Sequence, residues 1–223
     1  MSAIVIEGAI PAERVALIRS TIAGGPFVPG SQTAVGGAAK LKNNLQLAPD
    51  SRAAQQAVAL LVETLQVNAA FQAATWVDAV MTPLFARYEP GMTYGNHIDG
   101  AIMGEPPMTI RCDIAVTICL NDGASYEGGE LVIDAAGAAR SWKGKPGDAI
   151  VYPADTLHRV EPVTKGIREV AIFWVQSLIR DPGQRRILFD LKSVLDGFDL
   201  GGTTGSYVET LRRSYFNLIR MWA

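Results

Sequence analysis

KPGDAIVYPADTLHRVEPVTKGIREVAIFWVQS, residues 145–177, holds two apolar runs that are rich in β-branched and aromatic residues, 148–153 and 168–177. The turn signal KPGD opens the stretch, and a polar segment with a single histidine separates the two runs. Both runs have the length and composition of short β-strands. The stretch therefore predicts two strands within a β-rich region.

The same pattern of short strands and turns extends toward the N-terminus. β-Prone runs lie at 75–89, 111–120 and 130–134, and the turn signals NDG and EGGE lie at 121–123 and 127–130. Many short strands separated by turns at such intervals favour a sandwich or a barrel. We therefore predict a mainly β core of the jelly-roll type over residues 75–178.

Helical patterns flank this core on its N-terminal side, over residues 1–74. Pro11 suits the first turn of a helix, and a second helix is expected to begin near Asp50 or Ser51, both good N-caps. The apolar stripes of these two helices are Val15, Ile18 and Ile22, and Val58, Leu61, Val62 and Leu65. The Gly-rich segment 24–39 between them is expected to be a loop.

Residues 179–223 return to helical spacing, which completes an α+β arrangement of a β core with N-terminal and C-terminal helices. The two C-terminal stripes are Ile187, Leu188, Leu191, Val194 and Leu195, and Val208, Leu211, Tyr215, Leu218 and Trp222. We expect these helices to support the barrel or to lie at a subunit interface. A homo-oligomer formed through them remains open.

Composition restricts the classes of function. The 223 residues are 48% hydrophobic, and 20 Lys and Arg face 22 Asp and Glu, so the net charge is −2. The sequence contains no cluster of Lys and Arg that would indicate nucleic-acid binding. No secretory signal and no apolar stretch of about 18 residues occur, so we expect a cytoplasmic protein without a membrane partner. Cys112 and Cys119 share one strand roughly 23 Å apart, too far to pair, and are expected to pack as small apolar residues.

The chain has only two histidines, His97 and His158. Asp99 follows His97 by two residues, and this spacing places both side chains on one side of an extended segment. A second imidazole from a distant strand would complete a facial triad of two histidines and one carboxylate, which suits non-haem Fe(II) and oxygen activation. An HxD motif alone is more often a chance match than a metal site. A single histidine near a strand end is more often an ordinary polar group than a metal ligand.

Arg168 strengthens the metal interpretation. It shares a strand face with Val170, Ile172 and Trp174, so it points inward if they do. A buried guanidinium needs an anion, and its planar fork matches a carboxylate such as the distal one of 2-oxoglutarate. The alternative is a surface arginine that pairs with Glu169 or Glu161.

Three further polar residues lie close to the HxD motif in sequence. The Tyr88 hydroxyl is either a donor to a bound carboxylate or part of a core aromatic at a strand end. Tyr94 and Asn96 flank His97 and are candidates to orient the ligands.

Taken together, RYEPGMTYGNHIDGA (87–101), TICLND (117–122), YEGGEL (126–131) and the 145–177 stretch resemble the PKHD-type hydroxylases, a bacterial group related to the prolyl and lysyl hydroxylase domain. The resemblance implies a double-stranded β-helix fold. It implies Fe(II) held by His97, Asp99 and His158, and 2-oxoglutarate held by Arg168 with Tyr88 nearby. It further implies O2 as a substrate and ascorbate as the usual reductant.

The expected activity is that of an Fe(II)- and 2-oxoglutarate-dependent dioxygenase that hydroxylates an unidentified substrate and releases succinate and CO2. Because Asp99 is present, the halogenase variant is disfavoured. Other hypotheses are a non-catalytic sensor of iron or 2-oxoglutarate, a cupin-type metalloenzyme and a purely structural sandwich. The substrate is a peptide or a small molecule, and segments 24–39 and 100–108 are candidates to shape its entrance.

Overall fold

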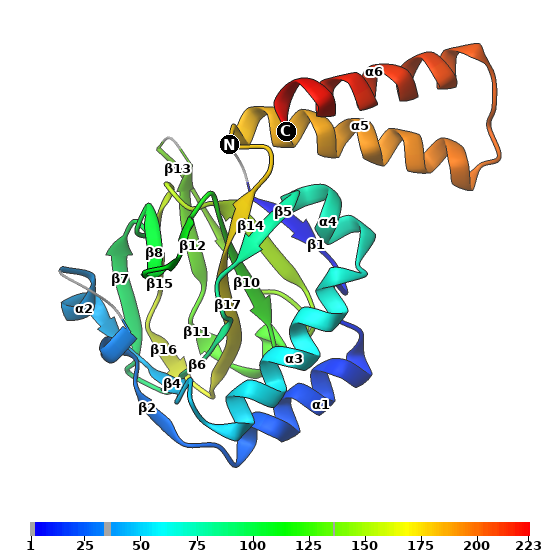
Figure 1. The fold of residues 1–223 in the computed structure, drawn as a ribbon. Helices are drawn as coiled ribbons and strands as arrows, with labels where there is room; N and C mark the ends of the chain where they lie inside the picture. Colours follow the sequence, from blue (N-terminus) through cyan, green and yellow to red (C-terminus); the bar gives the residue numbers. More distant parts are fainter. Residues whose placement is uncertain (1–2, 34–36, 136) are drawn as a thin grey trace.

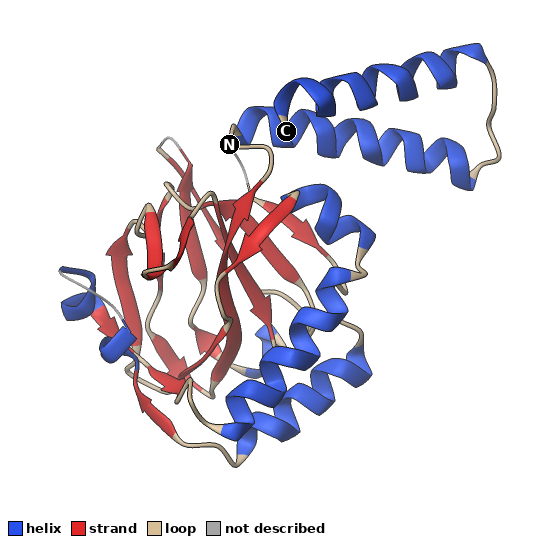
Figure 2. Ribbon diagram, in the orientation of Figure 1, coloured by secondary structure: helices blue, strands red, loops and turns tan. Residues whose placement is uncertain are grey.

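The computed structural model describes residues 3–33, 37–135 and 137–223. Two antiparallel sheets face each other, and helices cover the outer side of the larger sheet (Figures 1 and 2). The strands are β1 (Ile4–Ile6), β2 (Phe27–Pro29), β3 (Lys42–Asn43), β4 (Leu45–Leu47), β5 (Val77–Val80), β6 (Leu84–Tyr88), β7 (Thr93–His97), β8 (Ile102–Glu105), β9 (Met108–Arg111), β10 (Ile114–Cys119), β11 (Glu127–Gly128), β12 (Leu131–Ala135), β13 (Ala138–Trp142), β14 (Ala149–Pro153), β15 (Leu157–Val160), β16 (Val163–Lys165) and β17 (Arg168–Ser177). The helices are α1 (Ala12–Ala23), α2 (Gly37–Leu41), α3 (Arg52–Gln66), α4 (Ala69–Thr75), α5 (Pro182–Leu200) and α6 (Ser206–Trp222).

The larger sheet has the strand order β1-β14-β10-β17-β6-β4-β2, with β5 paired to the C-terminal end of β17. The smaller main sheet has the order β13-β12-β15-β7-β3. Two-stranded pairs, β8 with β9 and β11 with β16, complete the pairing among the described residues. This architecture confirms the jelly roll that the strand-and-turn pattern predicts.

The central strands of the larger sheet are buried on both faces. In β10, Ile114, Val116 and Ile118 pack toward the helices, whereas Ala115 and Cys119 face the smaller sheet. β17 alternates in the same way, because its partner strand fixes the register at Ile118↔Ala171 and Ala115↔Trp174. We call the region between the two sheets the chamber; the apolar residues packed there include Tyr88, Ala115, Tyr152, Val160 and Val170.

Helices α1, α3 and α4 bury their apolar faces on the outer side of the larger sheet, and Figure 1 shows α1 and α3 side by side. Ser51 caps α3 by accepting a hydrogen bond from the Ala54 amide, as the sequence predicts. Both cysteines are buried and unpaired, as expected. Among the described helices, no single one is long and apolar enough to cross a membrane; α3 and α4 reach that length and composition only together, across an 86° bend.

Helices α5 and α6 form an antiparallel hairpin that projects from the barrel (Figure 1). Its small core consists of Ile179, Leu188, Leu195, Val208 and Tyr215, and Trp76 packs against it from the barrel. The buried Arg185 donates hydrogen bonds to the backbone carbonyls of Ile179 and Arg180, just before the hairpin, and to that of Asp113 in the barrel. Subunit contacts through this hairpin stay a prediction.

The N-terminal part differs from the sequence expectation, because it is not only helical. β1, β2, β3 and β4 add strands to the edges of both sheets. The Gly-rich segment 24–39, expected to be a loop, contains β2, a 3-10 turn at Gly30–Thr33 and the start of α2; residues 34–36 lie outside the described part. Segment 100–108 likewise contains β8 and the start of β9 rather than an irregular loop.

Candidate active site

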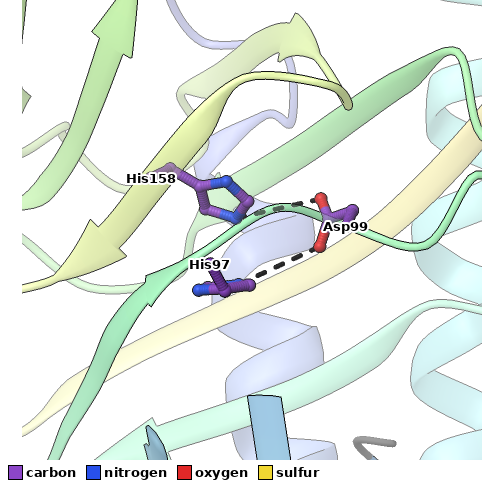
Figure 3. A group of neighbouring side chains, drawn as sticks. All are labelled: His97, Asp99 and His158. Atoms are coloured by element: carbon purple, nitrogen blue, oxygen red, sulfur yellow. Dashed lines mark ion pairs between the residues drawn. The ribbon is translucent and has the colours of Figure 1, made fainter. Parts of the chain in front are cut away.

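His97, Asp99 and His158 meet at one end of the chamber (Figure 3). His97 ends β7, His158 lies in β15, and the two residues are direct partners across the antiparallel pair. His97 Nε2 lies 3.9 Å from Asp99 Oδ1, and His158 Nε2 lies 3.8 Å from Asp99 Oδ2. The three ligand atoms all lie within 4.8 Å of one another, so a single metal ion can contact all three.

Hydrogen bonds fix the orientation of both imidazoles. His97 Nδ1 lies 2.8 Å from the Gly95 carbonyl oxygen, and His158 Nδ1 lies 2.9 Å from that of Thr156. A carbonyl only accepts, so each Nδ1 carries a proton, and Nε2 is the nitrogen of each ring that faces the metal position. The Tyr94 ring stacks on His97 at 3.6 Å, and Tyr152 packs edge-on to His158 at 5.2 Å.

The electrostatics of the triad suit a cation. Burial, and then the neighbouring His158, lower the pKa of His97 to about 4, so this imidazole is neutral at pH 7. Burial raises the pKa of the Asp99 carboxyl, while His158, the Trp174 indole N–H and Lys42 oppose that rise. The neutral His97 imidazole, the His158 imidazole and one carboxylate that is costly to bury alone form a donor set that a divalent metal would stabilise.

Arg168 faces the same chamber from the larger sheet. Its side chain is 4% exposed, and its guanidinium lies 5.0 Å from the ring centre of Tyr88, its cross-strand partner. The surface-pairing alternative is wrong, because Glu169 accepts hydrogen bonds from Arg19 and Arg87 on the other face of the sheet. Glu161 pairs with Arg159.

Sequence reasoning missed Asn44, which lies beside Tyr88. Asn44 is 3% exposed, and neither polar atom of its side-chain amide makes a hydrogen bond with the part of the chain that the structure describes. It and Arg168 lie close enough to the Tyr88 hydroxyl to lower its pKa, against the larger upward effect of burial. Orphaned buried amide atoms beside a guanidinium and a phenol fit a pocket that a carboxylate ligand would complete.

Polar and apolar residues alternate in β3 and β4, and this alternation is the sequence signal for the side of the chamber on which Asn44 lies. Lys42, Asn44 and Gln46 are buried and share one face, while Leu45 and Leu47 occupy the other. Gln46 aligns with Ala86, which faces the chamber, so the polar face is the inner one. Of the two candidates beside His97, Tyr94 contacts its ring, whereas Asn96 is exposed to solvent.

Comparison with known proteins agrees with this geometry. The profile of the 2OG-Fe(II) oxygenase superfamily matches residues 83–176, the span that holds all three triad residues and Arg168. A solved prolyl hydroxylase from Trichoplax adhaerens superposes with a TM-score of 0.59 at 14% identity and covers 84% of this chain and 86% of its own. The fold and the profile match thus both resemble those of the 2OG-Fe(II) oxygenases.

Two curated relatives narrow the class. A PKHD-type hydroxylase from Methylobacterium nodulans is 42% identical over 96% of this chain and 95% of its own length. Another from Caulobacter sp. strain K31 is 38% identical over 98% and 97%. The chain belongs to the PKHD-type hydroxylase family. It is an oxidoreductase, a dioxygenase whose family implies Fe(II), 2-oxoglutarate and O2.

Proposed function

We propose that this dioxygenase holds ferrous iron with His97, Asp99 and His158 and anchors 2-oxoglutarate with Arg168, assisted by Tyr88 and Asn44. The observation that supports this most is the pairing of two features across one chamber. Three metal donors lie on the smaller sheet and on the segment that follows β7, and a buried arginine without a carboxylate partner among the described residues faces them from the larger sheet. A ligand that carries both a metal-binding end and a carboxylate would join them.

When bound, iron and 2-oxoglutarate supply the oxidation, in which O2 is consumed, succinate and CO2 are released and a C–H bond of the substrate is hydroxylated. The chain itself positions the metal and the cosubstrate and limits their contact with water. The backbone carbonyls of Gly95 and Thr156 hold both histidines in the metal-binding tautomer. Arg168 pairs with the distal carboxylate, and the apolar lining limits water. We include ascorbate as the reductant on the basis of the family resemblance.

The substrate is a small molecule or a peptide that enters near the β8–β9 hairpin. Support for this entrance comes from two observations: Met103 of β8 packs against the chamber lining, and Ile98 and Ile102 nearby are exposed. An exposed apolar rim beside a chamber is typical of a ligand entrance.

Anaerobic titration with Fe(II) and then 2-oxoglutarate tests the site. We expect a weak visible charge-transfer band in the wild type, because 2-oxoglutarate would chelate ferrous iron. The band should be absent in His158→Ala, and Arg168→Ala should need about a hundredfold more 2-oxoglutarate, since a buried charged pair is lost. Arg159→Ala is the matched control, because Arg159 adjoins His158 in β15 but pairs with Glu161 away from the chamber.

Binding without turnover would indicate a sensor rather than an enzyme. In air, the wild-type protein with Fe(II) should consume 2-oxoglutarate slowly and produce succinate even without the substrate. No band with iron demonstrably bound would contradict the 2-oxoglutarate assignment. A normal band with no succinate over many hours would favour the sensor.

A further inference from the structure

Trp174 lies on the same face of β17 as Arg168, further along the strand toward its C-terminal end. Val170 and Ile172 lie between the two residues on that face, and Trp174 packs with both against the apolar cluster of the chamber. At about 3.3 Å per residue, this stretch of strand separates Trp174 from Arg168 by roughly 20 Å. β17 therefore carries Arg168 at the carboxylate end of the chamber and Trp174 well away from it.

Backbone contacts bring the segment that holds Asp99 to the part of the larger sheet where Trp174 lies. The carbonyl of Ala101, which follows Asp99 by two residues, accepts a hydrogen bond from the Cys112 amide at 2.9 Å. Cys112 lies just before β10, and Ala115 of β10 is the cross-strand partner of Trp174. Trp174 is thus located at the metal end of the chamber, on the opposite sheet from the two histidines.

The indole N–H of Trp174 is a buried donor. Its nitrogen makes no hydrogen bond with the part of the chain that the structure describes. Buried polar groups without a partner are rare in native proteins, so each one needs an explanation. The N–H lies close enough to the Asp99 carboxylate to lower the pKa of that carboxyl, against the larger upward effect of burial. The acceptor within its reach is therefore a metal donor.

The Asp99 carboxylate has an oxygen to offer this donor. Its Oδ1 lies 3.9 Å from His97 Nε2 and its Oδ2 lies 3.8 Å from His158 Nε2, and both distances are too long for hydrogen bonds. Where one of these oxygens binds a metal, the other still needs a hydrogen bond, because the Asp99 side chain is only 7% exposed. The hydrogen bond that a buried carboxylate ligand makes with its surroundings commonly sets its orientation.

We propose that Trp174 is a positioning residue, whose indole N–H donates a hydrogen bond to the Asp99 oxygen that does not bind the metal and so holds the carboxylate toward the metal position. The inference rests on the proposed function, because it concerns the same triad. Trp174 acts through Asp99 and lies far from the Arg168 pocket. It therefore controls the affinity of the site for the metal and not its affinity for 2-oxoglutarate.

Two substitutions separate the donor from the ring. Trp174→Phe keeps an aromatic ring and removes the N–H, whereas Trp174→Gln removes the ring and keeps an N–H donor at the same number of bonds from Cβ. Mn(II) is titrated into each metal-free protein, and the free ion is followed by electron paramagnetic resonance. Trp174→Phe should bind Mn(II) about tenfold more weakly than the wild type, or weaker still. Trp174→Gln should bind Mn(II) more tightly than Trp174→Phe, although it loses more packing.

Trp76→Phe is the matched control, because Trp76 carries another buried indole N–H without a partner among the described residues, beside Tyr215 of the hairpin. It should leave the affinity for Mn(II) unchanged. Calorimetry at saturating Mn(II) should give the same 2-oxoglutarate affinity for Trp174→Phe and the wild type.

Three results would overturn the inference: Trp174→Phe binds Mn(II) as the wild type does, Trp174→Gln binds it more weakly than Trp174→Phe, or Trp174→Phe loses as much affinity for 2-oxoglutarate as for Mn(II). The second and third results would mean that Trp174 acts by packing. A wild type that binds no Mn(II) marks failure of the proposed function itself, and this inference fails with it.

Discussion

We expect the buried ammonium of Lys42 to lower the free energy of unfolding of the metal-free protein. Its folded-state pKa, about 8, lies below the ordinary 10.5 because burial disfavours the charged form. The folded state therefore binds fewer protons than the unfolded state between these values, so wild-type stability rises with pH across that window. Below pH 8, the full free-energy cost of burying the charged Lys42 side chain is present. Lys42→Met should raise the free energy of unfolding at pH 7 by on the order of 2–3 kcal/mol.

Urea denaturation of the metal-free proteins at pH 7 and pH 10 measures this effect. The advantage of Lys42→Met over the wild type should narrow at pH 10, where the wild-type lysine is neutral when folded. Lys40→Met should show neither effect. A variant less stable than the wild type at pH 7 would mean that Lys42 contributes more by its contacts than its burial costs.

At the residue scale, the three candidate metal donors could be predicted from the sequence, whereas the polar inner face of β3–β4 could not. His97, Asp99 and His158 stand out because the chain has only two histidines and an HxD spacing. Arg168 follows from the alternation of an apolar strand. Asn44 lies outside any apolar period, because the inner face of β3–β4 carries buried polar side chains, and a search for apolar alternation passes over such a face.

At the element scale, long elements were predictable because each has a wide apolar face. β10, β17 and α3 appear where period-two or helical spacing predicts them. β3 and β4 have two and three residues, too few for any period to show. Their positions come from pairing with β7 and β6, which lie far along the chain, so tertiary contacts decide them.

The EGGE turn supports the carboxylate end of the chamber. Gly128 has φ +70°, and a Cβ there would lie 2.0 Å from the carbonyl oxygen of Pro162, the residue just before β16. Gly129, at φ +66°, leaves room for the Arg168 side chain, since its Cβ would approach Arg168 Cδ to 3.3 Å. Two adjacent glycines are thus needed where β11 passes close to β16 and to Arg168.

Gly128→Ala should lower the free energy of unfolding by about 2–5 kcal/mol, because left-handed strain and a backbone clash act together. It should also weaken 2-oxoglutarate binding, since β11 and β16 must separate next to Arg168. Gly137→Ala is the matched control: φ is +83° but no atom lies within 4 Å, so only the strain of about 1–2 kcal/mol is expected. Equal losses in both variants, measured by urea denaturation, would contradict the close approach at Gly128.

At the scale of the whole molecule, the site joins two separate layers. His97 and His158 belong to the smaller sheet, and Arg168 and Tyr88 belong to the larger one. A metal ion alone would therefore contact only the smaller sheet and the Asp99 segment. 2-Oxoglutarate, bound to that metal and to Arg168, would bridge the sheets across the chamber.

This arrangement predicts an ordered pattern of thermal stabilisation. Mn(II) at 100 times its Kd adds about 2.7 kcal/mol, which for a chain of this size raises Tm by about 5–10 °C. 2-Oxoglutarate should add a further rise only when Mn(II) is present, because its metal-binding end needs the ion. In Arg168→Ala, Mn(II) should still raise Tm, but 2-oxoglutarate should add no further rise. In Asp99→Ala, neither ligand should raise Tm. If 2-oxoglutarate raised Tm equally in Arg168→Ala and the wild type, it would be held by the metal side alone, and the two sheets would not be linked through Arg168.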